Sequence, residues 1–211
     1  MKIISLRSLS CAAVFAIAFV AAGRAEESDT GTVSAQALQA KLTYCKTCHG
    51  VEAQGLRGAF PIPRLAGQQP QYIKNQLQAF IEGKRKNPVM FRVAHVLSPA
   101  MVAGLAEQFK KLNPKPLGGA PMALVPAGKD IFEKGVPSAN VPPCASCHGP
   151  DAKGNGEFPR LAGQLNDYIV SKLENWTKER GTETSAIMAP IAHELTKDQI
   201  AAVAAYLSTL D

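Results

Sequence analysis

Two five-residue strings place two thiols and an imidazole at the same spacing. One runs from Cys45 to His49 (Cys-Lys-Thr-Cys-His) and the other from Cys144 to His148 (Cys-Ala-Ser-Cys-His). Thiols one helical turn apart can each form a thioether with a haem vinyl group, and the adjacent histidine then presents a ring nitrogen to the iron. C-x-x-C-H is the attachment signature of c-type haem, so the two copies predict two covalently bound haem c groups.

The predicted attachment residues are therefore Cys45, Cys48, Cys144 and Cys147, with His49 and His148 as iron ligands. Two other uses of paired cysteines fit less well. A zinc site needs four ligands, and each string supplies three with no further cysteine or histidine nearby. A thioredoxin-like dithiol needs a βαβ pattern, which the sequence does not show.

The N-terminal segment 1–25 has the pattern of a secretory signal peptide. Two basic residues precede the apolar run 11–22, and a small-residue cleavage site ends at Ala25. The run is too short to span a bilayer, and no later stretch is long and apolar enough to do so. Cys11 leaves with the signal, and the four remaining cysteines all lie in the two strings. Export and cysteine usage thus predict haem attachment in a bacterial periplasm.

An internal duplication gives the domain organisation. With the haem strings aligned at an offset of 99, the segment Pro-Arg-Leu-Ala-Gly-Gln recurs at 63–68 and 159–164. Between the copies, residues 114–121 are rich in proline and glycine and predict a connector. We therefore expect one domain at 26–113 and a second at 122–211.

Each copy is predicted to be all-α, with three main helices around its haem. In the first copy these are 33–44, 70–84 and a helix that begins with Ser98-Pro99 as its cap and first residue. In the second copy, Thr196 and Gln199 form a capping box at the start of the last helix. The fold class is thus all-α, in two tandem homologous domains.

The second axial ligand of each iron is predicted to be a methionine. Met90 and Met188 correspond in the duplication and are expected in loops just before the last helix of each copy. Methionine opposite histidine raises the haem potential and is common in electron carriers; its alternative role is to fill a core gap. His95 and His193, five residues further on, are the rival ligands or else ordinary, partly exposed histidines.

The duplicated string also offers supporting groups. A proximal histidine needs an acceptor for its second ring N–H, and the carbonyls of Pro63 and Pro159 are candidates. Arg64 and Arg160 are expected either to pair with haem propionates or to be surface charges.

Charge is divided unevenly along the chain. Residues 26–116 hold 12 Lys and Arg against 6 Asp and Glu, whereas residues 117–211 hold 8 against 11. This pattern is either a solvated surface or a device that steers the protein toward an oppositely charged partner. No basic-aromatic cluster suggests nucleic acid as that partner.

On these residues the chain resembles the dihaem cytochrome c4 family, from Tyr44 to Leu210. The resemblance rests on the two haem strings, the repeated proline-arginine segments, Tyr72 and Tyr168, Gly83-Lys84-Arg85, Asn87-Pro88-Val89-Met90 and Ala204-Ala205-Tyr206-Leu207. It implies two tandem class I cytochrome c domains related by a pseudo-twofold axis, His/Met ligation at both irons and electron shuttling in the periplasm toward a terminal oxidase. The chain departs from the family pattern by the inserted Pro61-Ile62 and the bulky Phe91-Arg92.

The leading hypothesis is a periplasmic electron carrier without catalytic residues. Its expected donor is a quinol-oxidising complex or a dehydrogenase, its expected acceptor a terminal oxidase or similar protein, and any membrane association would come through those partners. Haem subunits of sulfide- or alcohol-oxidising dehydrogenases look similar, so a subunit of a periplasmic dehydrogenase complex is the first alternative. A dihaem peroxidase, in which one iron releases its distal ligand, is the second.

Overall fold

The computed structural model describes residues 31–179 and 186–211. The predicted signal peptide, 1–25, lies outside the described residues. Within them every regular element is a helix, and extended pairing is limited to three isolated bridges that close short loops. The predicted all-α class is confirmed.

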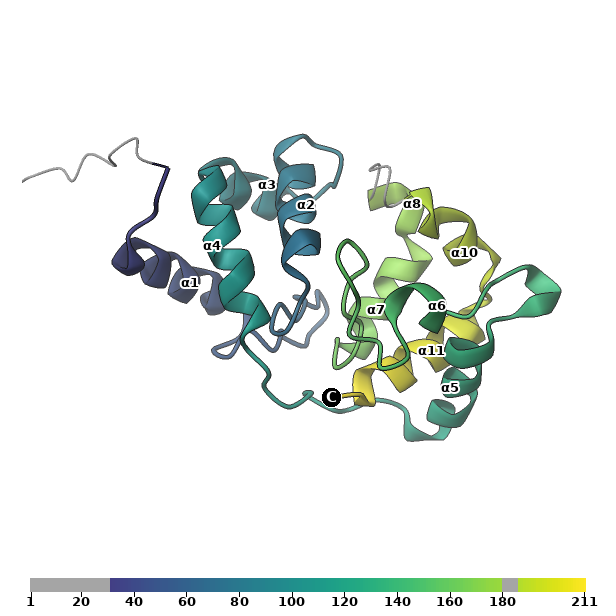
Figure 1. The fold of residues 1–211 in the computed structure, drawn as a ribbon. Helices are drawn as coiled ribbons and strands as arrows, with labels where there is room; N and C mark the ends of the chain where they lie inside the picture. Colours follow the sequence, from purple (N-terminus) through teal and green to yellow (C-terminus); the bar gives the residue numbers. More distant parts are fainter. Residues whose placement is uncertain (1–30, 180–185) are drawn as a thin grey trace, which may run out of the picture. The chain divides into compact units, whose positions relative to one another are not determined.

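The first module contains four helices, drawn from purple to teal in Figure 1: α1 (Ala35–His49), α2 (Pro70–Ile81), α3 (Pro88–His95) and α4 (Pro99–Lys110). The Ser34 hydroxyl accepts the Ala37 N–H and so caps α1. Ser98 caps α4 in the same way, with Pro99 at the first helical position as predicted. Helix α1 runs through the haem string to His49, five residues beyond the predicted end.

The second module is drawn from green to yellow. Its elements are η1 (Met122–Leu124), α5 (Val125–Lys134), η2 (Pro137–Ala139), α6 (Ala145–His148), α7 (Asn166–Glu174), α8 (Trp176–Glu179), α10 (Met188–Glu194) and α11 (Lys197–Thr209). The predicted capping box of α11 is present, because the Gln199 N–H donates to Thr196 Oγ1 and the Thr196 N–H to Gln199 Oε1. The haem string is separated from α5, because α5 ends at Lys134 with Gly135 as its C-cap at φ 71°.

The expectation that both methionines lie in loops is wrong. Met90 is the third residue of α3, and Met188 is the first residue of α10. The cause of α3 is local: the Asn87 side chain accepts the Met90 N–H at 2.9 Å, and Pro88 occupies the first helical position. A polar cap residue followed by proline is a recognisable signal for the start of a helix, and this helix start fixes the backbone of Met90.

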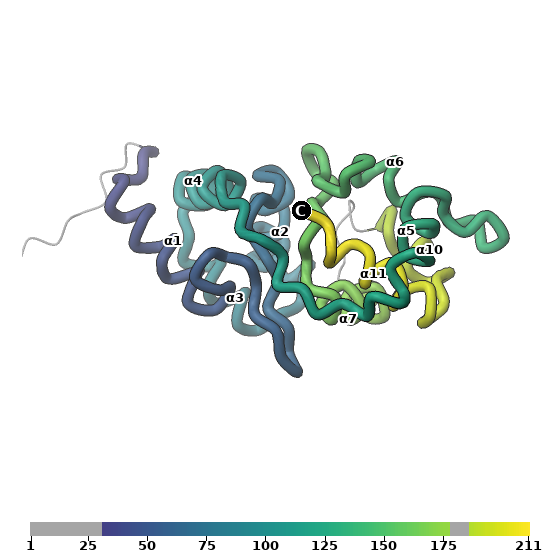
Figure 2. Tube along the Cα trace, turned by 90° about the horizontal axis from the view of Figure 1, so that it is seen from below, coloured from purple at the N-terminus to yellow at the C-terminus, as the bar shows by residue number. Residues whose placement is uncertain are grey.

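The two modules bury equivalent side chains. In the first, α4 packs on α1 and α2; in the second, α11 packs on α5 and α7, as Figure 2 shows for α5 and α11. Buried positions that correspond in the duplication are Ala53 and Ala152, Ala66 and Ala162, Ile73 and Ile169, Leu105 and Val203, Ala106 and Ala204, and Phe109 and Leu207. The duplication seen in the sequence is thus a duplication of the core.

Small residues let the first and last helices of each module approach closely, and this leads to a stability prediction. A Cβ at Gly128 of α5 would collide with the Ala202 carbonyl of α11, whereas a Cβ at Gly104 of α4 would lie 3.0 Å from Cδ1, at the end of the Leu38 side chain. We expect Gly128→Ala to lower the free energy of unfolding by about 2 kcal/mol through overpacking against backbone. Gly104→Ala should change it by less than about 1 kcal/mol, because better helix propensity offsets the contact.

Denaturant unfolding of the two holoprotein variants, followed by circular dichroism, measures the difference. If Gly128→Ala and Gly104→Ala lowered the free energy of unfolding equally, the backbone contact at Gly128 would not limit the packing of α5 on α11.

Among the described residues no single helix is both long and apolar enough to cross a membrane. Helices α3 and α4 reach that length only together, as a pair bent by 115°.

Candidate haem sites

Each haem string lies at the end of a helix, which sets the directions of its three side chains. In the first module Cys45, Cys48 and His49 occupy the last turns of α1; in the second Cys144 precedes α6, and His148 ends it. All four thiols are unbridged, with one half-buried and one exposed in each string. Burial raises the pKa of the Cys45 thiol, and it raises the pKa of Cys144 to about 11. The half-buried cysteines are therefore neutral thiols near pH 7.

The two histidines are buried and held in one tautomer. His49 Nδ1 lies 2.8 Å from the Pro63 carbonyl oxygen, and His148 Nδ1 lies 3.0 Å from that of Pro159. A carbonyl only accepts, so Nδ1 carries the proton and Nε2 keeps its lone pair. Burial lowers the pKa of both imidazoles, so they are neutral near pH 7. The predicted role of the two proline carbonyls is confirmed, and each Nε2 can bind a metal.

A tight loop brings each proline carbonyl to its histidine. In the first module the Ala53 carbonyl accepts the N–H groups of Leu65 and Ala66, and the His49 carbonyl accepts that of Gly55. Gly55 has φ +94°, and a Cβ there would lie 2.9 Å from the Arg64 nitrogen. Only glycine fits that approach. The same bonds recur around Ala152 and Gly154, so the two sites are built alike.

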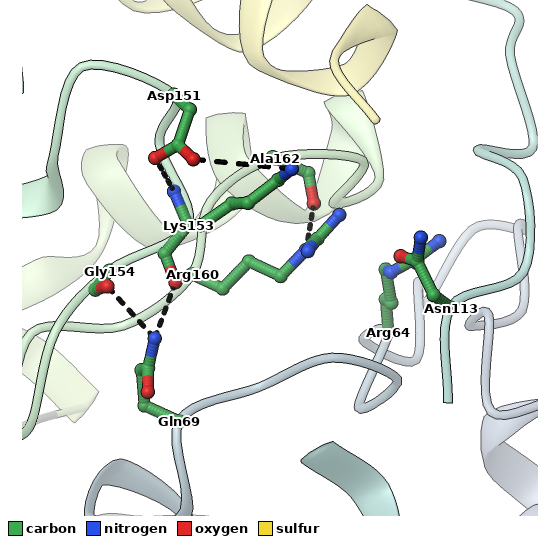
Figure 3. A network of polar contacts seen from close by, with 8 residues as sticks. All are labelled: Arg64, Gln69, Asn113, Asp151, Lys153, Gly154, Arg160 and Ala162. Carbon is green, nitrogen blue, oxygen red and sulfur yellow. Dashed lines mark hydrogen bonds and ion pairs between the residues drawn. The ribbon is translucent and has the colours of Figure 1, made fainter. Parts of the chain in front are cut away.

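The interpretation of Arg64 and Arg160 as surface charges is wrong. They are only 3% and 7% exposed. Each Nε donates to a backbone carbonyl two residues ahead, Ala66 and Ala162, at 3.0 Å; Figure 3 shows the second of these bonds. Burial lowers the pKa of Arg64 to about 10, so its guanidinium keeps its charge at neutral pH.

Those guanidiniums supply a test of whether a haem fits. Arg64 Nη1 and Arg160 Nη2 are buried and have no acceptor within the described part of the chain. A buried charged N–H group without an acceptor is costly, and an anionic oxygen of a bound group would satisfy it. Haem carries such oxygens as propionates. Together with two thiols and a fixed imidazole in each module, the donor set fits two haem c groups.

The predicted methionine ligands and the rival histidines differ in their exposure to solvent. Met90 and Met188 are half-buried, whereas His95 and His193 are exposed. The His95 ring packs against that of Phe91 at a tilt of 38°, with 5.0 Å between ring centroids, and His193 Nδ1 lies 3.2 Å from a carboxylate oxygen of Glu194. A cleft of about 400 Å³ runs beside α10, the helix that begins with Met188; Trp176, Ala189, Leu195 and Ile200 are among its lining residues.

The insertion in the first proline loop makes the two modules unequal. Ile62 pairs with Leu56 where Phe158 pairs with Asn155, so Ile62 takes the place of the second module's aromatic residue. Phe158 lies edge-on to His148, with 6.3 Å between ring centroids. Phe60 is pushed into solvent and is 91% exposed.

Sequence reasoning missed the polar contacts that join the modules. Gln68 contacts the backbone of Arg160 through both amide atoms, and Gln164 contacts that of Arg64 in the same way. Arg85 adds a 2.8 Å bond from Nη2 to the Tyr168 hydroxyl. The only signal was the repetition of the glutamine in both copies, which does not by itself reveal a partner in the other copy.

Comparisons with known proteins agree with this geometry. The sequence profile of the Cytochrome c family matches residues 35–115 and again 125–211. Cytochrome c-552 of Acidithiobacillus ferridurans is 37% identical, over 93% of this chain and 86% of its own length. The thiosulfate dehydrogenase electron acceptor of Thiomonas intermedia is 38% identical, over 78% of this chain and 77% of its own.

A solved structure of a c-type cytochrome is also similar to this chain. The cytochrome c4 of Acidithiobacillus ferrooxidans superposes with a TM-score of 0.68 at 36% identity, covering 79% of this chain and 98% of that one. The predicted resemblance, cofactors and electron-carrier function are confirmed. The chain belongs to the dihaem cytochrome c4 family, and it is an electron-transfer protein with two covalently bound haem c groups that works with redox protein partners.

Proposed function

We propose that each module holds one haem with its own residues and caps the iron on both sides. Cys45 and Cys48 would hold the haem of the first module through thioethers, and Cys144 and Cys147 that of the second. His49 with Met90 would bind the first iron, and His148 with Met188 the second. The proposed domains are 26–113 and 122–211, joined by the connector 114–121. The observation that carries this proposal is the fixed tautomer of both histidines, which leaves Nε2 of each imidazole available to an iron.

The bound haem supplies an iron that gains and loses one electron. The chain's own residues bind and orient it: the proline carbonyls hold the imidazoles, and the buried guanidiniums of Arg64 and Arg160 donate to the propionates. With histidine and methionine at both irons, no coordination position is open to substrate. The protein then transfers electrons without catalysing bond chemistry, and a peroxidase function is not proposed.

The proposed place of work is the periplasm, after removal of residues 1–25. The proposed donor is a quinol-oxidising complex or a dehydrogenase, and the proposed acceptor is a terminal oxidase. A second candidate, a dedicated electron acceptor of a periplasmic dehydrogenase, is favoured by the similarity to a protein named thiosulfate dehydrogenase electron acceptor. The basic first module suits an acidic redox partner, and the acidic second module suits a basic one, so electron donor and acceptor could bind different modules.

A redox titration with spectra tests the carrier proposal. We expect two one-electron waves and low-spin spectra in both oxidation states. The half-reduced protein should react only slowly with hydrogen peroxide, because neither iron has an open position. A high-spin signal from one haem, or rapid consumption of peroxide, would contradict the proposal and favour a peroxidase. Rapid reduction by a thiosulfate-oxidising dehydrogenase, compared with reduction by a quinol-oxidising complex, separates the two partner classes.

A further inference from the structure

The proline-arginine peptide of each module is hydrogen-bonded at both ends. The Pro63 carbonyl accepts from His49 Nδ1 at 2.8 Å, and the N–H of the same peptide group, which belongs to Arg64, donates to Gln164 Oε1 at 2.9 Å. One planar peptide therefore lies between the histidine of the first module and a glutamine of the second.

The arrangement is reciprocal. The Pro159 carbonyl lies 3.0 Å from His148 Nδ1, and the Arg160 N–H donates to Gln68 Oε1 at 2.7 Å. Each histidine is thus joined, through one peptide group, to the glutamine of the opposite module.

Both glutamines are fixed in place. Gln164 is 7% exposed; its Nε2 donates to the Arg64 carbonyl at 3.1 Å, and its Oε1 also accepts the Leu165 N–H at 3.0 Å. Gln68 is 6% exposed and makes the matching bonds to the Arg160 carbonyl and the Gln69 N–H. The amide oxygen cannot turn away from the peptide without leaving buried groups unpaired.

We propose that Gln164 and Gln68 are positioning residues that tune the haem of the opposite module. This inference rests on the proposed ligation by His49 and His148. A peptide whose N–H donates to an acceptor becomes more polar, so its carbonyl accepts more strongly from the histidine. A stronger bond at Nδ1 makes the imidazole a better electron donor to iron and favours the ferric state. Loss of the glutamine should therefore raise the potential of the haem in the other module.

Gln164→Met and Gln68→Met test this crossed dependence in the full-length holoprotein. The potential of each haem is followed by NMR of its methyl signals, assigned by contacts with the residues of its own module. We expect Gln164→Met to raise the potential of the first haem and leave the second nearly unchanged. Gln68→Met should do the reverse.

Gln69 offers a matched control at the same interface. Its Nε2 donates across the interface to the carbonyls of Lys153 and Gly154 at 2.7 and 2.8 Å, but it does not touch either proline-arginine peptide (Figure 3). Gln69→Met removes these bonds between the modules and should leave both potentials unchanged. The proposal would be overturned if a glutamine variant shifted the potential of the haem in its own module, shifted both haem potentials equally, or shifted neither. It would also be overturned if Gln69→Met shifted the potentials in the same way.

Conservative variants keep the test decisive if a methionine variant fails to assemble. Gln164→Glu retains an acceptor oxygen for the Arg64 N–H, so the first haem should not rise in potential. Gln69→Glu and Gln69→Met both lose the Nε2 bonds to the Lys153 and Gly154 carbonyls, so the difference between them measures the effect of the added charge. A rise in Gln164→Glu would refute the role of the acceptor. The spectrum of the unaltered protein is recorded first: absence of low-spin His/Met haem would refute the ligation itself, whereas a normal spectrum without crossed shifts would refute only the tuning.

Discussion

Replacement of Met188 with alanine is expected to open the distal side of the second haem and to lower its potential. Methionine sulfur stabilises the ferrous state, and axial ligands set haem potentials over a range of roughly 0.8 V, so a sizeable part of that range should be lost. One of the two haems should become high-spin or bind an external ligand such as imidazole, while the first haem keeps its spectrum. Electron paramagnetic resonance and a redox titration measure both effects. Met90→Ala should do the same to the first haem.

Two other methionines serve as controls for this prediction. Met101 is 6% exposed in the core of the first module, so Met101→Ala should reduce stability by about 2–5 kcal/mol and preserve low-spin ligation. Met122 is 66% exposed, so Met122→Ala should change neither property. If Met188→Ala leaves both haems low-spin at unchanged potentials, the assignment of Met188 as a ligand is wrong; His193 then becomes the residue to substitute.

The double substitution Cys144→Ala, Cys147→Ala is expected to halve the covalently attached haem. No other thiols lie in the second module, so its haem would have no covalent attachment. The module should also lose much of its stability, because a domain of about 90 residues has a small core and a bound haem adds apolar contact. Extraction with acidified acetone and haem staining of the denatured chain report the attached haem. Circular dichroism reports the fold.

Ser146→Ala is the control within the same string. Ser146 is exposed; its hydroxyl donates to the Pro143 carbonyl at 2.6 Å and makes only a weak, 3.9 Å contact with Cys147 Sγ, so this variant should keep two haems per chain. Retention of two attached haems in the double cysteine variant would show that the thioethers form elsewhere. Loss of both would show that assembly of the first module depends on the second.

Much of the site follows from spacing along the chain. The two C-x-x-C-H strings fix the cofactor type and number, because both thiols and the imidazole lie within one helical turn. Caps were equally local: Ser98 and Thr196 begin their helices as predicted. The helix that holds Met90 was missed although its signal, Asn87 before Pro88, is present. Helix α3 has only eight residues, which is too short for a periodic apolar pattern to show in the sequence.

The sequence by itself determined that this protein carries two haem c groups in two duplicated all-α modules, since these properties depend on covalent spacing and helical period. Only the tertiary structure decided that Arg64 and Arg160 are buried and that each glutamine meets the peptide behind the other module's histidine. The partners in those bonds are separated by 100 and 92 residues along the chain. Contacts at that separation arise from packing of one module on the other, and no local pattern encodes which amide will face which peptide.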